Sequence, residues 1–166
     1  MRAIGASNLT PQRLAEALDT SSKHNLPRYE TLQPLYNLYD RSDFESGLEA
    51  ICRENELGVI PYYSLASGFL TGKYRSKDDL GQSARGAAVE KYLTDRGSRI
   101  IAALDQVARA NDATPAQIAI AWLIAHPAIT APIASATRSA QLGELIDATQ
   151  IKLDAEAIAL LNKASA

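Results

Sequence analysis

The feature that most constrains this chain is a repeating pattern: a short apolar run, a polar turn, and then apolar residues at helical spacing. The short runs lie at residues 2–6, 32–36, 58–62 and 130–134. Strands that alternate with helices indicate βα units around a parallel sheet. The sequence therefore predicts an α/β fold of four consecutive βα units, with residues 1–166 as a single domain.

Residues that favour helix starts precede several of the expected helices. Ser, Thr and Asp side chains accept hydrogen bonds from the first backbone amides of a helix, and proline suits its first position. The expected caps are Thr10, Ser42, Thr114 and Asp154. Glu45 and Gln117 stand three residues after Ser42 and Thr114, so both sites have the pattern of a capping box.

Composition excludes two classes of partner. The chain has 17 Lys plus Arg, 19 Asp plus Glu and a formal charge of -2, without a basic run that could follow the phosphates of a nucleic acid. Its longest apolar stretch, residues 118–125, is shorter than the roughly 20 residues that cross a bilayer.

Cys52 has no cysteine partner, and the first residues lack the features of a leader peptide. We expect a cytoplasmic protein with no nucleic-acid or membrane partner.

Periodicity does not decide whether the βα units form an open sheet or part of a barrel. Motifs decide between them. The relevant segments are RAIGASN at residues 2–8, QPLYNL at 33–38, IPYYSLASGFLTGKY at 60–74 and PIASATRSAQLGE at 132–144. In this order and at this spacing, they resemble the aldo-keto reductase family over essentially the whole chain. The resemblance implies the C-terminal half of a (β/α)8 TIM barrel, because it covers the last four of eight units.

The resemblance also implies a site for a nicotinamide cofactor at the C-terminal ends of the strands, where TIM barrels place their sites. Ser7 and Asn8 would hydrogen-bond the nicotinamide carboxamide, helped by Gln33, and the ring of Tyr62 would lie flat on the nicotinamide. Taken without the family, Ser7 and Asn8 are equally well explained as a turn that starts a helix. An aromatic pair after a strand is more often a packing feature.

The sequence departs from the family pattern beside Tyr62. Many relatives read Tyr-Ser-Pro, whereas this chain has Tyr62, Tyr63 and Ser64. The second tyrosine replaces a small hydroxyl residue, and Ser64 replaces a proline. The resemblance therefore assigns no role to Tyr63.

The residues expected to bind the phosphates of the cofactor lie in the segment after Ser64. The small residues around Leu65, Ser67 and Gly68 allow backbone amides to approach a pyrophosphate closely. Lys73 would add a positive charge. Arg85 is a further candidate for the same cofactor, or equally an exposed loop arginine.

The adenosine end of the cofactor is assigned to the last turn and the helix after it, whose N-terminus favours anions. The implied contacts are Ser135, Thr137, Arg138, Gln141 and Glu144. Arg138 favours the 2′-phosphate of NADP(H) over NAD, although a simple surface charge is the alternative. Leu145 stands where the family often has Asn, so one adenine contact would be missing.

No catalytic residue is predicted in this chain. The family transfers hydride between the nicotinamide and a carbonyl, using a Tyr supported by Lys, Asp and His from the first four units, and no segment here matches them. His24 and His126 are expected in the last turns of helices, and Cys52 is expected as a buried thiol. The sequence shows no cluster with metal-ligand spacing.

A half-barrel would expose two sheet edges and an apolar inner face. Two copies could pair, an N-terminal half-barrel partner could cover the face, or elements could rearrange; we favour self-association. The sequence thus predicts an NADP(H)-dependent oxidoreductase for aldehydes or ketones, in which this chain supplies the cofactor-binding half and is inactive alone. The alternative is a non-catalytic half-barrel module that binds a nucleotide or only another subunit.

Overall fold

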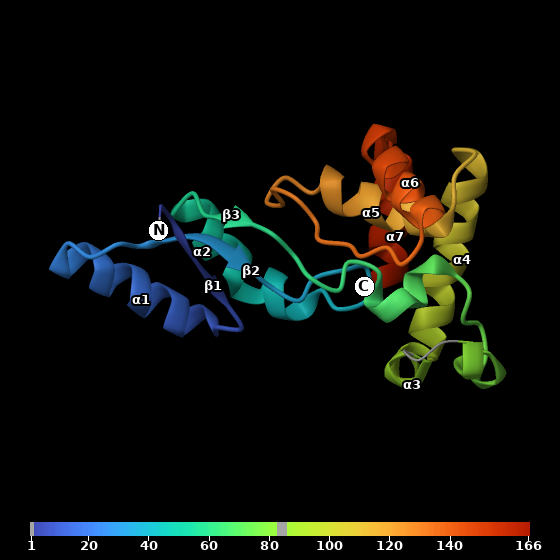
Figure 1. Cartoon of the computed structure of the whole chain (residues 1–166), viewed down its shortest axis with the longest axis horizontal. Coiled ribbons are helices and arrows are strands. Elements are labelled where there is room, and N and C mark those ends of the chain that lie inside the picture. The colour runs from blue at the N-terminus through green and yellow to red at the C-terminus, as the bar shows by residue number, and fades with distance from the viewer. Residues whose placement is uncertain (1, 83–85) are drawn as a thin grey trace.

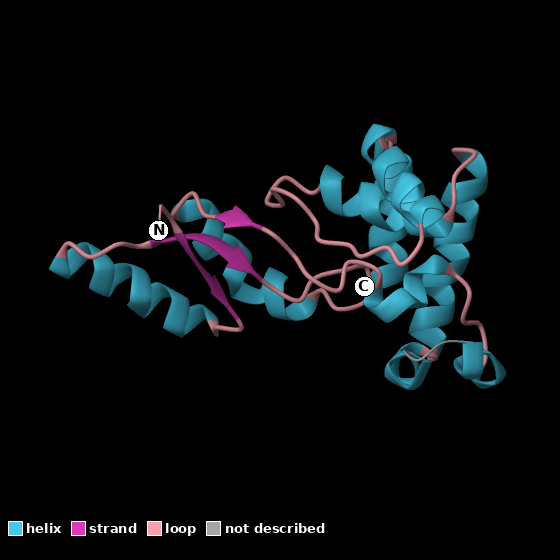
Figure 2. Cartoon of the chain, viewed as in Figure 1, coloured by secondary structure: helices cyan, strands magenta, loops and turns pink. Residues whose placement is uncertain are grey.

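The computed structural model describes residues 2–82 and 86–166 and contains a parallel sheet with helices. Within these residues the sheet has three strands, β1 (Ile4–Ser7), β2 (Tyr29–Gln33) and β3 (Gly58–Val59), in the order β1-β2-β3. Figure 1 shows the sheet at one end of an elongated chain, with the larger helices of the C-terminal half gathered at the other end. The two ends are linked mainly by loops, as Figure 2 makes clear.

Helices of very different length connect and follow the strands. The longer ones are α1 (Pro11–His24), α4 (Asp95–Ala110), α5 (Pro115–Ala125), α6 (Ser139–Asp147) and α7 (Ala155–Ser165). The shorter ones are η1 (Phe44–Leu48), α2 (Glu49–Glu54), η2 (Ala66–Thr71), η3 (Lys77–Gln82), α3 (Gly86–Val89), η4 (Glu90–Tyr92) and η5 (Ala148–Gln150). None of the helices in the described ranges is long and apolar enough to span a membrane.

The strand bounds differ from the sequence-based expectation: β1 covers residues 4–7 instead of 2–6, and prolines end two other strands early. β2 begins and ends earlier than residues 32–36, and β3 stops at Val59 instead of residue 62. Pro34 and Pro61 interrupt both segments, and proline has no N–H to donate to a neighbouring strand. The segments that follow β2 and β3 nevertheless stay side by side, because the Tyr62 N–H donates to the Pro34 carbonyl at 2.9 Å. They form one further parallel bridge between Leu35 and Tyr62.

The expected fourth strand, residues 130–134, is not formed. This segment lies beside β3, since the Thr130 N–H donates to the Val59 carbonyl at 2.9 Å and the Ile133 N–H to the Pro61 carbonyl at 3.0 Å. Pro132 lies between these donors and cannot continue a ladder. The prediction of four complete strands is therefore wrong for the described structure, which has three.

Three of the four expected helix caps are confirmed. Thr10 Oγ1 accepts from the Arg13 N–H, Asp154 Oδ1 accepts from the Ala157 N–H, and Thr114 forms the full capping box with Gln117. The capping box expected at Ser42 is absent among the described residues. The Glu45 carboxylate that should complete it instead accepts from Tyr36 and Arg41.

The sheet is covered on one face. Ala6, Leu32 and Val59 are buried and belong to one core with Leu14 of α1 and Cys52 of α2. Successive residues of a strand point to opposite faces, so the neighbours of these residues lie on the other side. Several of these neighbours are exposed, namely Gly5, Ser7 and Gln33. The second face of the sheet is thus open, and polar side chains stand at its edge.

Candidate functional site

The ends of β1 and β2 bring two of the predicted contacts together. Ser7 and Gln33 are register partners at the last positions of their strands. The Ser7 hydroxyl donates to the Gln33 backbone carbonyl at 2.9 Å. Its oxygen can still accept a hydrogen bond, because a hydroxyl has two lone pairs. The next residue, Asn8, has a φ of 55°, a left-handed conformation that asparagine tolerates better than most residues.

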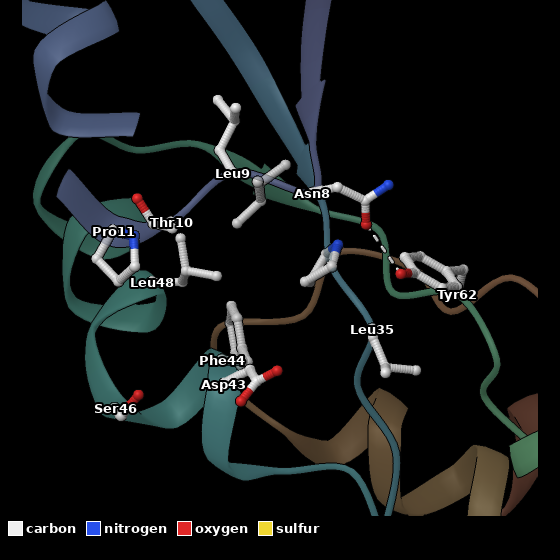
Figure 3. Close-up of a pocket in the computed structure, with 12 residues that line it drawn as sticks. Asn8, Leu9, Thr10, Pro11, Leu35, Asp43, Phe44, Ser46, Leu48 and Tyr62 are labelled. Atoms are coloured by element: carbon white, nitrogen blue, oxygen red, sulfur yellow. Dashed lines mark hydrogen bonds between the residues drawn. The ribbon is translucent and has the colours of Figure 1, made fainter. Parts of the chain in front are cut away.

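Tyr62 joins this group from a position 54 residues further along the chain. Its hydroxyl donates to Asn8 Oδ1 at 2.9 Å, as drawn in Figure 3. Within the described part of the chain, Asn8 Nδ2 has no acceptor. We call Ser7, Asn8, Gln33 and Tyr62 the strand-end cluster. It offers an amide donor, a hydroxyl acceptor and a half-buried aromatic ring, which matches the donors, acceptors and flat surface of a nicotinamide.

A pocket of about 430 Å³ borders the strand-end cluster. It opens between the loop after β1 and η1, and Figure 3 shows Leu9, Leu35, Phe44 and Leu48 around it. Asn8 and Tyr62 form one side of it, whereas Ser7 and Gln33 do not line it. The pocket is therefore a neighbour of the predicted nicotinamide contacts and does not contain all of them.

The predicted pyrophosphate contacts lie on a strained turn. Ala66, Ser67 and Gly68 have consecutive φ values of 48°, 59° and 97° in η2. Non-glycine residues in this region cost energy and cluster at functional sites. The Lys73 side chain lies against the same turn, since a Cβ placed on Gly68 would meet Lys73 Nζ at 3.7 Å. Lys73 thus lies beside Gly68, and Leu65 and Ser67 belong to the same turn.

The predicted contacts to the adenosine end form a separate group. Gln141 Oε1 accepts from both the backbone N–H and the hydroxyl of Thr137, each at 3.0 Å. Arg138 occupies the N-cap position of α6 and is exposed, as are Ser135 and Glu144. An exposed guanidinium at a helix N-terminus suits a phosphate group. No contact in the described residues joins this group to the strand-end cluster, and Arg85 lies outside the described residues.

Two buried polar residues near the cluster were not singled out from the sequence as part of the site. Asn37 is 0% exposed and Ser64 is 1% exposed, and both bind backbone groups around the loop that carries Tyr62. Polarity in a segment that also resembles the family was the available signal. Polarity alone could not identify Asn37 and Ser64 as supporting residues, because their burial depends on segments far away in the sequence.

The buried titratable side chains are explained by packing. Burial and a hydrogen bond to Glu45 raise the pKa of the Tyr36 hydroxyl, and burial and a hydrogen bond to Asp40 raise that of Tyr92. Burial raises the pKa of the Cys52 thiol to about 11, so the thiol stays protonated and unreactive at neutral pH. In the described ranges no group of His, Cys, Asp and Glu is arranged to hold a metal ion.

A parallel sheet with helices, and polar residues after its strands, defines an α/β protein of the kind that binds ligands at the carboxyl edge of the sheet. The model of the aldo/keto reductase family matches residues 1–166, and the chain belongs to that family. This confirms the resemblance seen in the four motifs.

The chain is similar to proteins from bacteria, fungi and plants. The chain is 30% identical to protein tas of Escherichia coli K12 over 161 residues, which are 96% of this chain and 46% of tas. It is 32% identical over 112 residues to the Schizosaccharomyces pombe aldo-keto reductase yakc, whose name includes NADP(+), covering 66% of this chain and 33% of yakc. It is 30% identical over 154 residues to a probable voltage-gated potassium channel subunit beta of Arabidopsis thaliana, covering 89% and 46%. The chain thus spans less than half the length of each of these relatives.

Proposed function

We propose that this chain is the cofactor-binding half of an NADP(H)-dependent oxidoreductase that transfers hydride between the nicotinamide and an aldehyde or ketone. One observation carries the proposal: the hydrogen bond between Tyr62 and Asn8 joins distant segments into the strand-end cluster. The bound cofactor would supply the hydride. Ser7, Asn8 and Gln33 would orient its carboxamide, and Tyr62 would support its ring.

The choice of NADP(H) rests on the positive groups beyond the cluster. Lys73 would neutralise the pyrophosphate over the turn at Ser67 and Gly68. Arg138 at the start of α6 would bind the 2′-phosphate, with Ser135, Thr137, Gln141 and Glu144 around the adenosine. The name of the relative yakc, which includes NADP(+), supports the same cofactor.

We further propose that the chain corresponds to four βα units of a (β/α)8 barrel, in which residues 130–134 take the place of the fourth strand. The open face of the sheet and the free outer edge of β1 support this arrangement in the described structure. A second copy or an N-terminal half-barrel, whether separate or joined to this chain, would cover that face. The catalytic residues would come from such an N-terminal half, so these 166 residues alone are expected to bind cofactor without reducing carbonyls.

Titration with NADPH and NADH tests the cofactor assignment. Arg138→Ala should weaken NADPH binding about tenfold and leave NADH binding unchanged, because only NADPH carries the 2′-phosphate. Arg13→Ala is the matched control, since Arg13 is an exposed arginine on α1 with only an exposed partner, Glu16. Equal loss of both cofactors, or no binding by the folded wild-type chain, would contradict the proposal.

A second candidate function is a non-catalytic module that assembles with another subunit. Ile124 on α5 and Leu142 and Ile146 on α6 are exposed apolar side chains that favour a protein partner. The relative named as a channel subunit also supports this reading. The loss of NADPH absorbance with an aldehyde substrate distinguishes the two: turnover after addition of an N-terminal half-barrel supports the split enzyme, and stable assembly without turnover supports the module.

A further inference from the structure

The loop after β3, residues 61–64, is held from one side by a buried hydroxyl. Ser64 is 1% exposed, and its Oγ donates to the Ile133 carbonyl at 2.7 Å. A second acceptor, the Pro61 carbonyl, lies further away at 3.4 Å. Because a hydroxyl has one hydrogen, the shorter contact to Ile133 takes it. The loop that presents Tyr62 is thereby tied to the segment that leads to the predicted adenosine contacts, two residues before Ser135.

The same loop is held from the other side by Asn37. This side chain is fully buried, and its Nδ2 donates to the Tyr63 carbonyl and to Asp40 Oδ2, both at 3.0 Å. Its Oδ1 accepts from the backbone N–H groups of Tyr39 and Asp40 at 2.8 and 2.9 Å. An amide side chain has two N–H donors and one acceptor oxygen with two lone pairs, so Asn37 is fully satisfied. It therefore has one fixed orientation.

The conformation between these two anchors depends on the absence of a proline at position 64. Tyr63 has a φ of 55°, and it is 57% exposed with its ring 5.3 Å from that of Tyr62. A residue before proline is restricted to extended conformations, so a proline at position 64 would oppose this left-handed turn. Ser64 permits the turn and fixes it with a side-chain hydrogen bond instead of a rigid ring.

We propose that Asn37 and Ser64 are positioning residues that together hold Tyr62 at a fixed distance from the adenosine-binding turn. This inference rests on the proposed function, because it assigns the two ends of one cofactor to the two segments that Ser64 connects. Neither side chain touches the cofactor in this scheme. Asn37 and Ser64 keep the loop ordered before any ligand binds. Because ordering a flexible loop during binding lowers affinity, this pre-ordering should strengthen binding of a ligand that spans both segments.

The test compares a ligand that spans both segments with one that reaches only the second. NADPH and 2′,5′-ADP are titrated into the wild-type chain, Ser64→Ala and Asn37→Asp. The Asn37→Asp variant keeps the size of the side chain but loses the donors to Tyr63 and Asp40. We expect NADPH binding to weaken about five- to tenfold in both variants and 2′,5′-ADP binding to change less than about twofold. Amide hydrogen exchange should become faster at residues 62–64 and, in Ser64→Ala, also at Ile133, whose N–H donates to the Pro61 carbonyl of the same loop.

Ser165→Ala is the matched control. Ser165 is as buried as Ser64, at 1% exposure, and its hydroxyl also donates to a backbone carbonyl, that of Leu161 at 2.8 Å. Its loss should lower stability while leaving the ratio of the two affinities unchanged. Unchanged exchange at Ile133, or equal weakening of both ligands in Ser64→Ala, would overturn the inference. Failure of the wild-type chain to bind either ligand would instead overturn the proposed function, and the exchange result would still decide whether Ser64 orders the loop.

Discussion

His126, at the C-terminal end of α5, is half-buried and packs against three aromatic rings. Its ring centroid is 5.5 Å from that of Tyr36, 6.4 Å from that of Phe44 and 6.3 Å from that of Trp122. Burial lowers the pKa of the imidazole, although the nearby carboxylates of Glu49 and Glu45 oppose the effect. The folded chain therefore binds this proton more weakly than the unfolded chain does.

This difference predicts a loss of stability in acid. The imidazole of the unfolded chain has a pKa of about 6.5. The stability that the neutral His126 side chain contributes is therefore fully present above pH 6.5. It is lost as pH falls from that value through the lower pKa of the folded chain. The free energy of unfolding in urea, compared between pH 8 and pH 5.5, measures this loss of stability. His126→Gln should reduce the stability difference between the two pH values, whereas His24→Gln, at an exposed position, should not. An unchanged pH dependence in His126→Gln would rule out this residue as its source.

At the scale of elements, Arg41 connects the loop after β2 to α7. Its Nε donates to Glu45 at 2.7 Å, and its Nη1 donates to Ser165 Oγ at 2.6 Å. Its guanidinium also lies 5.4 Å from the ring centroid of Trp122. The side chain is only 18% exposed, so solvent screens these interactions poorly.

Arg41→Ala should destabilise the chain by about 2 to 4 kcal/mol, because it leaves Glu45 and Ser165 without a charged partner. Arg13→Ala breaks an ion pair of which both members are largely exposed, and it should cost less than about 0.5 kcal/mol. Thermal or urea unfolding of both variants provides the comparison. Similar losses in the two variants would mean that Arg41 does not hold the two elements together.

The sequence predicted elements well where their cause is local. The caps at Thr10, Thr114 and Asp154 depend on residues three positions away and are found as expected. The capping box at Ser42 failed because Glu45 is bound by Tyr36, nine residues earlier, and by Arg41. Likewise, the strand ends could not be predicted from apolar runs alone, because prolines in those runs interrupt the hydrogen bonding between strands.

The candidate site was predicted in the same uneven way. The strand-end cluster could be proposed because its residues follow apolar runs and match family motifs, and the structure brings all four together. The supporting contacts of Ser64 were not foreseen, because its partner Ile133 is 69 residues away. Short-range patterns indicate which residues could bind a ligand, but they do not reveal which buried groups hold them in position.

For the whole molecule, the exposed apolar side chains predict self-association. Leu142 and Ile146 lie one turn apart on α6 and are 53% and 57% exposed. A double change of both to Glu should shift the purified chain toward monomer in sedimentation experiments over a range of concentrations, because charges oppose burial of this surface. Leu26→Glu, at a site that is 54% exposed just beyond α1, should have no such effect. A wild-type chain that is monomeric at all concentrations would contradict the prediction.

The order of the strands in the sheet is the same as their order along the chain. Paired residues such as Ser7 and Gln33 are therefore only 26 residues apart in sequence. Each strand can dock on the one synthesised just before it, without waiting for a distant segment to leave the ribosome, and short loops are closed at low entropic cost. The sheet can thus be assembled stepwise during translation, and the Tyr62 to Asn8 contact can form only after the third strand has emerged.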